Sequence, residues 1–457
     1  MDAKALQAER ISLYDDYYNH KIPKRLPVSM STSHHILAEL GGIDFFDFQY
    51  DYGRLSEEAE KMCERLYSDT CPVGGVGAAS RIPAYYQLLE SLSLQMGSGG
   101  FVQHPNTIGM LYEDYEALIA DPYAALLEIV IPRQFPGLSM DDPVKRGSAI
   151  HMSIQSRLED GMGLAPTIAA LMEKYGYYPG PPRGSSGGFT TAPYDFLADQ
   201  LRSFTEISKD IRRNRQLVLD ACEALYPLMF LNGLPQLPAP QGGSGSPLHM
   251  PTYMREKDFV EVWLPTYRRM LEQYAARGVR INIFCEHDWM RYLDILADLP
   301  VGNTYRFEFG DPQLVKDKLG GKYFLSGLYP ILNVKTKTKQ ENIDEVKKLL
   351  DIMMPGGGYL FGFDKGPILL SDIPMENYCA VAETVRDYAV YDNAGASFGT
   401  PLNSEKFKAD PTPRIVSKYA FNWDDFKAQY PYTPDFARER MERYHHDMYK
   451  YYISLLG

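Results

Sequence analysis

The sequence predicts an α/β protein that folds as a closed (β/α)8 TIM-type barrel. Three observations lead to this prediction: strands and helices alternate regularly between residues 246 and 391, further strand-like segments precede residue 110, and several strands end in titratable residues. Strands that alternate with helices form parallel sheets. In such barrels the carboxyl ends of the strands carry the functional groups.

The length and composition are those of an ordinary globular protein. The 457 residues would allow roughly three domains, but a single barrel with additions also reaches this size. Apolar residues make up 45% and charged residues 23%, which allows a large core. The net charge of −12 and the pI near 5.3 argue against nucleic acid as a partner, because phosphate binding needs a positive surface.

The cysteines and the amino-terminal residues lead us to expect a soluble cytoplasmic protein. The five cysteines are scattered and include no CxxC pair, which argues against a disulfide framework. The first ten residues lack the apolar core of a signal peptide. The longest apolar runs, such as residues 124–132, are far shorter than the roughly 18 residues of a membrane span.

The first third of the chain predicts helices with a few short strands. A polar helix is expected over 1–22 and a first strand over 26–31. Strand-like segments follow at 71–82 and 97–104, and the second of these ends at His104. Helical patterns are expected over 57–67, 112–131 and 141–176.

Two loops rich in Gly and Pro flank a long helical pattern in the middle of the chain. The first loop, residues 179–193, is long enough to suggest a lid or a binding loop. Helical spacing of apolar residues then runs over 195–230. The second loop spans 236–247 and leads into the regular repeat.

The regular repeat consists of five strand–helix units. The strands are expected at 246–249, 279–285, 304–309, 322–328 and 358–363, and the helices at 256–277, 288–296, 311–319, 339–354 and 375–391. The short connections allow only neighbouring strands to pair. Together with the earlier strands, the repeat favours a closed barrel over an open sheet.

The chain is therefore divided into three parts. Residues 1–25 form an amino-terminal helical segment, residues 26–398 form the barrel, and residues 399–457 form an aromatic-rich appendage. The appendage ends in a predicted helix over 435–456. We expect it to pack on the barrel or on a second subunit.

The strand over 279–285 ends in the strongest cluster of titratable residues. Glu286 and His287 are predicted to act as general acid or metal ligand; the alternative is a hydrogen-bonded pair that caps the next helix. Asp288 is expected to be such a cap, since carboxylates are favoured at helix amino termini. Strand alternation points Cys285 to the face opposite Glu286, so Cys285 is expected to be structural.

Other strand ends supply further candidates. His249, Glu308 and His104 are predicted to contact the substrate, with a loop histidine as the alternative for His249. Asp364 is predicted to be catalytic, with an ion pair to Lys365 as the alternative. If the barrel closes, His249, Glu286 and Asp364 meet at one mouth, where one His and two carboxylates could hold zinc.

Three segments carry a resemblance to a known family. They read GGFTTAPYDFLADQLRSFTEISKDIRR at 187–213, HMPTYMREKDFVEVWLPTYRRMLEQYAARGVRINIFCEHDWMRYLDIL at 249–296, and DEVKKLLDIMMPGGGYLFGFDKG at 344–366. In order and spacing, residues 25–395 resemble the uroporphyrinogen decarboxylase superfamily, which includes cobalamin-dependent methyltransferases. The resemblance implies a distorted (β/α)8 barrel with its site at the carboxyl ends of the strands, and a homodimer.

Two departures narrow what the resemblance implies. Near the amino terminus the decarboxylases carry several arginines that bind substrate carboxylates, whereas residues 23–35 here offer only Lys24 and Arg25. Thiol-methylating relatives hold zinc on a His-x-Cys pair, and here Phe284 and Glu286 occupy those positions. The chain thus looks like the subgroup that demethylates small methylated substrates and passes the methyl group to the Co(I) of a separate corrinoid protein.

Three functions are therefore carried forward. The first is corrinoid-dependent demethylation of a methoxylated aromatic or an N-methylated compound. Cleaving an ether calls for a proton donor, whereas a methylammonium calls for an aromatic or anionic surrounding. The second is decarboxylation of a small carboxylated substrate. The third is non-catalytic binding of a small molecule by a barrel.

Overall fold

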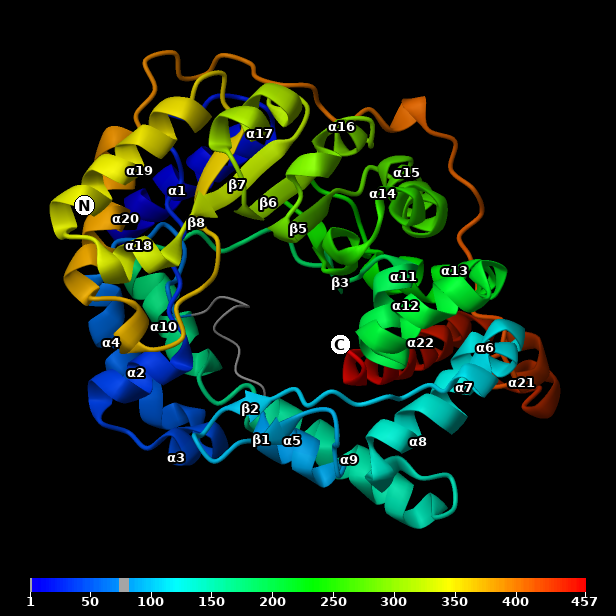
Figure 1. Ribbon diagram of the computed structural model, residues 1–457. Coiled ribbons are helices and arrows are strands. Elements are labelled where there is room, and N and C mark those ends of the chain that lie inside the picture. Colours follow the sequence, from blue (N-terminus) through cyan, green and yellow to red (C-terminus); the bar gives the residue numbers. More distant parts are fainter. Residues whose placement is uncertain (1, 74–81) are drawn as a thin grey trace.

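The computed structural model describes residues 2–73 and 82–457, and its centre is a parallel sheet (Figure 1). Six strands lie in the order β3-β4-β5-β6-β7-β8. They are β3 Ser186–Phe189, β4 Gly243–Leu248, β5 Ile281–Asp288, β6 Thr304–Phe309, β7 Phe324–Tyr329 and β8 Tyr359–Phe363. Because all six strands are parallel, their carboxyl ends lie along one edge of the sheet.

The alternation of β5 shows how the sheet is packed. Ile281, Ile283 and Cys285 are buried, with at most 1% of each residue exposed. Phe284 and Glu286 are partly exposed on the opposite face. Burial of a large aliphatic side chain contributes about 1.5–3 kcal/mol. The strand is therefore held by the face that carries Cys285, as predicted, and presents Glu286 on the other.

Helices cover the buried face of the sheet and connect its strands. Those of the second half are α13 Arg215–Gly233, α14 Glu256–Asp258, α15 Leu264–Ala275, α16 Leu293–Leu296, α17 Pro312–Leu319, α18 Ile331–Thr336, α19 Lys339–Met353 and α20 Met375–Tyr388. The side chain of Asp311 caps α17 by accepting from the backbone N of Leu314. Thr338 and Glu341 form a capping box at the start of α19. These local signals explain why the predicted helices begin where they do.

The first half of the chain is mostly helical. Its helices are α1 Ala3–Tyr18, α2 His34–Gly41, α3 Phe45–Tyr50, α4 Ser56–Arg65, α5 Pro83–Leu88, α6 Tyr115–Ala120, α7 Pro122–Ala125, α8 Ile131–Gln134, α9 Pro143–Glu159, α10 Ala165–Tyr175, α11 Pro193–Asp195 and α12 Phe204–Arg213. A separate antiparallel pair, β1 Gln95–Met96 and β2 Val102–Gln103, precedes His104. The predicted strand ending at His104 therefore exists but lies outside the parallel sheet.

The predicted strand over 26–31 is not a strand of the sheet. Leu26 and Val28 are fully buried as the pattern predicted. The backbone N of Val28 donates to the carboxylate of Asp69, however, and that of Leu26 donates to the carbonyl of Ala389. The segment is extended and packed, but its hydrogen bonds go to a side chain and a distant loop instead of a strand ladder.

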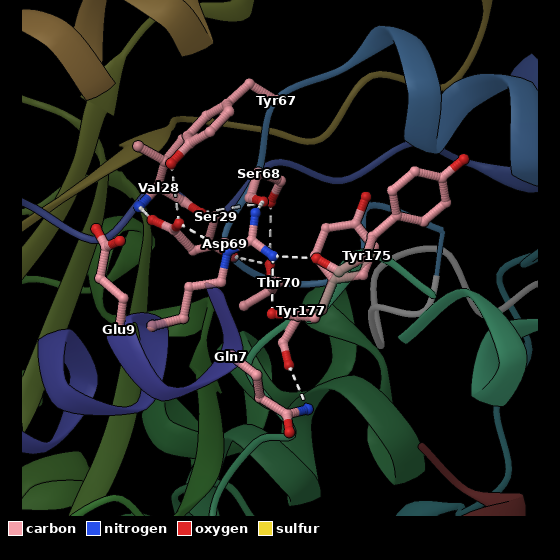
Figure 2. Close-up of polar contacts among 12 residues, drawn as sticks. Gln7, Glu9, Val28, Ser29, Tyr67, Ser68, Asp69, Thr70, Tyr175 and Tyr177 are labelled. Atoms are coloured by element: carbon pink, nitrogen blue, oxygen red, sulfur yellow. Dashed lines mark hydrogen bonds and ion pairs between the residues drawn. The ribbon is translucent and has the colours of Figure 1, made fainter. Parts of the chain in front are cut away.

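A buried charge cluster around Asp69 ties this segment to α1 (Figure 2). The carboxylate of Asp69 lies 3.2 Å from Nε of Arg10 and 2.7 Å from Nη1 of Arg25. Arg10 also donates to the carbonyls of Tyr175 and Gly176. Arg25, one of the two cations in residues 23–35, is thereby paired with Asp69.

The prediction of a closed eight-stranded barrel is confirmed only as a mixed α/β fold with a parallel sheet. Within residues 2–73 and 82–457 the sheet has six strands, with β3 and β8 at its two edges. β3 lies inside the stretch predicted to be a loop, residues 179–193. Most of the predicted strand 71–82 falls outside the described residues.

In the part of the chain that the structure describes, three π-helical segments interrupt the helices that surround the sheet. They are η4 Leu126–Val130, η6 Phe196–Arg202 and η8 Phe259–Trp263. Pro132 and Pro265 follow η4 and η8, and a proline removes the N–H that a regular helix would use. Such bulges are frequent at functional sites. The helical pattern predicted over 195–230 is thus divided by η6 and by Ser203, whose φ is 71°.

The appendage contains two α-helices, α21 Trp423–Gln429 and α22 Arg438–Leu455. In Figure 1, α22 (red) ends on the inner side of the ring of helices. None of the described helices combines the length and apolarity that crossing a membrane would require.

Candidate functional site

His249 follows β4 and lies between two carboxylates. Its Nδ1 is 2.9 Å from Oδ2 of Asp199, and its Nε2 is 2.7 Å from Oε2 of Glu286. Because a carboxylate can only accept, both ring nitrogens must carry protons to make both bonds. The geometry therefore describes an imidazolium held by two anions.

Asp199, His249 and Glu286 are called the triad below. The pKa values of His249 and Glu286 agree with the assignment of an imidazolium. Burial by itself would lower the pKa of His249, but the hydrogen bonds to Asp199 and Glu286 outweigh it and raise the pKa to about 10. The hydrogen bond from His249 lowers the pKa of Glu286. At neutral pH the proton therefore resides on His249, and Glu286 is a carboxylate.

Asp195 contacts the backbone of His249 and helps to hold the triad in place. It is 1% exposed, and its Oδ1 accepts from Nε1 of Trp263 at 2.8 Å. Its Oδ2 accepts from the backbone N of His249 at 3.3 Å. Burial, followed by the charge of Asp199, raises the pKa of Asp195 to about 7. Asp195 thus fixes the backbone of His249 and links α11, η8 and the end of β4.

His249 and Asp199 open onto a cavity of about 380 Å³. The cavity is lined by Ser93, Leu94, His104, Pro105, Asn106, Thr107, Gln134, Asp199, Gln200, Ser203, Phe204, His249, Leu455, Leu456 and Gly457. His104 and His249 therefore line the same cavity. Glu286 does not line this cavity and contacts His249 from the side of the sheet.

His287 and Glu308 form a second group at the end of β5. Nε2 of His287 is 2.7 Å from the hydroxyl of Tyr253 and 3.9 Å from Oε1 of Glu286. The backbone N of His287 donates to Oε2 of Glu308, whose Oε1 is 2.6 Å from Nζ of Lys365. His287 has a φ of 62°, a strained value for a residue with a side chain. Glu308 therefore stabilises a strained irregularity near the end of β5, where His287 contacts Tyr253.

Asp364 is placed by backbone groups. Its Oδ1 accepts from the backbone N of Ile331 at 2.8 Å and from that of Lys365 at 2.6 Å. The ammonium of Lys365 binds Glu308, so the alternative of an ion pair between Asp364 and Lys365 is not what the geometry shows.

The predicted zinc set comes together only in part, because His249 contacts Glu286 but Asp364 has other partners. Both ring nitrogens of His249 face carboxylates, and Asp364 is occupied by two backbone N–H groups. Among the residues that the structure describes, no three His, Cys, Asp or Glu side chains form a group that could hold a metal ion. The donors present therefore do not fit the zinc site that the sequence suggested.

The structure also shows the contacts of Asp288 and the burial of Cys285. Oδ1 of Asp288 accepts from the backbone N of Met290, the first residue of the 3-10 helix Met290–Tyr292, although the N-cap position of that helix is Trp289. Cys285 is fully buried, and burial raises its pKa well above the usual value. It is therefore a core thiol.

Sequence reasoning missed Asp195, Asp199 and Trp263. A signal was present, because Asp195 and Asp199 are four residues apart in a helical pattern and so share one face. Nothing in the local pattern, however, shows that this face meets the end of β4.

Comparison with known proteins adds little to this geometry. No protein-family model matches the chain, and no curated protein matches it. Among solved structures, the chain is similar to a methyltransferase from Methanosarcina mazei, with a TM-score of 0.46 and 14% sequence identity. The match covers 84% of this chain and 98% of that chain. A likeness of this degree carries no argument about the reaction, which has to come from the site.

Proposed function

We propose that this protein is a methyltransferase that removes the methyl group from a small O-methylated compound and passes it to the Co(I) of a separate corrinoid protein. One observation carries the proposal: an imidazolium, His249, is held between two carboxylates on the wall of a cavity of about 380 Å³. The resemblance of residues 25–395 to corrinoid-dependent methyltransferases supports the choice of acceptor.

The proton on His249 suits an ether substrate. When the methyl group leaves toward the acceptor, the electron pair of the C–O bond stays on the oxygen, which then needs a proton. The imidazolium of His249 has an N–H at the cavity wall and can supply this proton. A phenoxide is a better leaving group than an alkoxide, because a phenol is the stronger acid, with a pKa of about 10. A methoxylated aromatic is therefore the preferred donor.

The two carboxylates have different roles in this proposal. Asp199 lines the cavity, so its bond to His249 is the one that a substrate oxygen would replace. Glu286 stays ionised and keeps the imidazolium charged and oriented. The acid role predicted for Glu286 thus passes to His249, with Glu286 as its positioning residue.

A second candidate substrate is an N-methylated cation. Two carboxylates around one imidazolium leave one net negative charge beside the cavity, and the ring of Phe204 also lines it. A negative charge and an aromatic face stabilise a methylammonium. Such a donor would need no proton from His249, so its turnover should survive loss of the imidazole much better.

The two other functions receive less support from this cavity. A decarboxylase would bind its substrate carboxylates through cations, and the described residues that line the cavity include neither Lys nor Arg. A purely binding protein would have no use for a proton-bearing group held by two anions on the wall.

The test is methyl transfer in a defined mixture. Purified protein is mixed with a Co(I) corrinoid protein and a panel of methoxylated benzenes and methylammonium compounds, and methylation of cobalt is followed by absorbance. We expect transfer from a methoxylated benzene with release of the phenol, and its loss in His249→Gln. The matched control is His151→Gln, the same change at an exposed histidine on α9. No transfer from any donor would overturn the proposal.

A further inference from the structure

The appendage reaches the cavity that His249 opens onto. Leu455 and Leu456, at the end of α22, line that cavity although they belong to the appendage, which was expected to pack on the barrel or on a second subunit. They are only 2% and 1% exposed, so they are packed in place. The cavity is thus completed by residues more than two hundred positions away from His249 in the sequence.

Four contacts fix α22 in this position. The hydroxyl of Tyr449, a fully buried residue, donates to the carbonyl of Leu228 on α13. The ammonium of Lys450 lies 3.3 Å from the carbonyl of Gly187 on β3. Two further contacts bind the helix to α9. The hydroxyl of Tyr451 lies 2.9 Å from Oγ of Ser153, and Nη1 of Arg157 donates to Oγ of Ser454 at 3.0 Å. The end of α22 is therefore held in place as part of the cavity wall.

The wall made by α22 differs in character from the side that carries the triad. His249 and Asp199 contribute charged groups, whereas Leu455 and Leu456 border the cavity as apolar side chains that are almost fully packed. An apolar cavity of about 150 Å³ holds a benzene molecule. A volume of about 380 Å³ thus has room for one aromatic ring with substituents.

We propose that Leu455 and Leu456 form the specificity wall of the site. The reacting oxygen lies toward His249, and the far end of a single-ring donor lies against these two leucines. The wall then selects donors by the size of the group opposite the methoxy group. This inference rests on the proposed function for the identity of the site, and it adds which residues set the donor's size.

Two variants change the wall in opposite directions. In Gly457→Phe, an added Cβ would lie 3.1 Å from the end of the flexible Gln200 side chain, which also lines the cavity, so the new ring narrows the space. In Leu456→Val, one methylene is removed and the space widens slightly. The control is Tyr444→Ala, on the same helix but 53% exposed and about 16 Å away along its axis.

Binding is measured with two probes, phenol and 4-propylphenol, by titrating protein labelled with ¹³C in its histidine rings and following the His249 signal. We expect the ratio of the two Kd values, 4-propylphenol over phenol, to rise at least tenfold in Gly457→Phe. The ratio should fall about threefold in Leu456→Val and stay constant in Tyr444→Ala.

The outcomes separate this inference from the proposed function. An unchanged ratio in both wall variants, or no response of His249 to either phenol, overturns the specificity wall even if methyl transfer is observed. A shifted ratio without any methyl transfer supports the wall and removes the proposed reaction. Because Gly457 is exposed, Gly457→Phe gives a result even if Leu456→Val proves unstable.

Discussion

Two charge clusters, one around Asp69 and one around His249, use the same kinds of groups for different ends. The carboxylate of Asp69 is fully buried and receives Arg10, Arg25 and the backbone N of Val28. The His249 side chain is 39% exposed and faces a cavity. Arg10 and Tyr67 border a cavity of about 420 Å³, but the carboxylate of Asp69 does not line it. In the second cluster, Asp199 and His249 themselves line a cavity, so a substrate can replace one of the protein partners.

The two clusters also differ in whether they hold a proton that can be transferred. Burial would raise the pKa of Asp69, but the hydrogen bond and charge of Arg25 lower it overall, so Asp69 stays ionised beside cations that never release a proton. The pKa of His249 is raised to about 10, and its proton can be transferred. A buried ion cluster is therefore a functional candidate when it holds a transferable proton at a cavity wall.

The largest expected effect is on catalysis at His249. His249→Gln removes the proton donor, and the rate of methyl transfer from a methoxylated benzene should fall by about 10²–10⁴-fold. The fold should survive, so a urea titration should give nearly the wild-type midpoint. A rate within threefold of wild type would show that His249 is not the acid.

The Asp69 cluster should respond in the opposite way. Asp69→Asn leaves Arg10 and Arg25 buried without their anion, and breaking such a cluster costs about 3–5 kcal/mol in the free energy of unfolding. Activity per folded molecule should not change. Urea unfolding measures the loss of stability, and active-site titration of the same sample measures the activity per folded molecule. A loss of activity with unchanged stability would contradict the structural role.

A smaller effect is expected at Glu286. Glu286→Gln removes one of two charged hydrogen bonds to His249, and the rate should fall roughly tenfold, which corresponds to about 1.4 kcal/mol. The alkaline limb of the pH–rate profile should also move to lower pH, because the imidazolium has lost a stabilising anion. Glu376→Gln, at a side chain 74% exposed, is the matched control and should change neither.

The smallest effect is on the pH dependence of stability. The native state keeps the proton of His249 up to about pH 10, whereas the unfolded chain loses it near pH 6.5, so stability should decline as the pH rises between these values. Solvent screening makes the decline modest at a half-exposed side chain. Urea unfolding of His249→Gln should show a flatter profile over this range, and an unchanged slope would contradict the raised pKa.

Much of the sheet could be predicted because its strands carry local signals. β5, β6, β7 and β8 have buried apolar positions between clear turns and lie within a few residues of their predicted bounds. β3 is a short strand that contains Gly187 and Gly188. Because its sequence lacks apolar alternation, the pattern predicts a loop instead of a strand. Its pairing with β4 depends on tertiary structure. Conversely, Leu26 and Val28 alternate like a strand, but the groups that satisfy their backbone are not strands.

The site could be predicted only where a strand end pointed to it. His249 and Glu286 end adjacent parallel strands, so their contact follows from the predicted sheet. Asp199 lies on a π-helical segment that no apolar pattern places beside β4. Asp364 ends a strand too, but backbone N–H groups claim its carboxylate. Strand order indicates which residues share an edge, while loop hydrogen bonds decide which of them remain available.

The hydrogen bond from Leu26 to Ala389 has a consequence for how the chain folds. Successive strands from β4 to β8 are connected by 14 to 32 residues, so each can pair soon after it is formed. Leu26 and Ala389 are separated by more than three hundred residues, and closing a loop of that length costs roughly 2 kcal/mol more in chain entropy. We expect the parallel sheet to form early and the amino-terminal segment to dock late. Pulsed hydrogen exchange should accordingly protect Phe307 before Leu26.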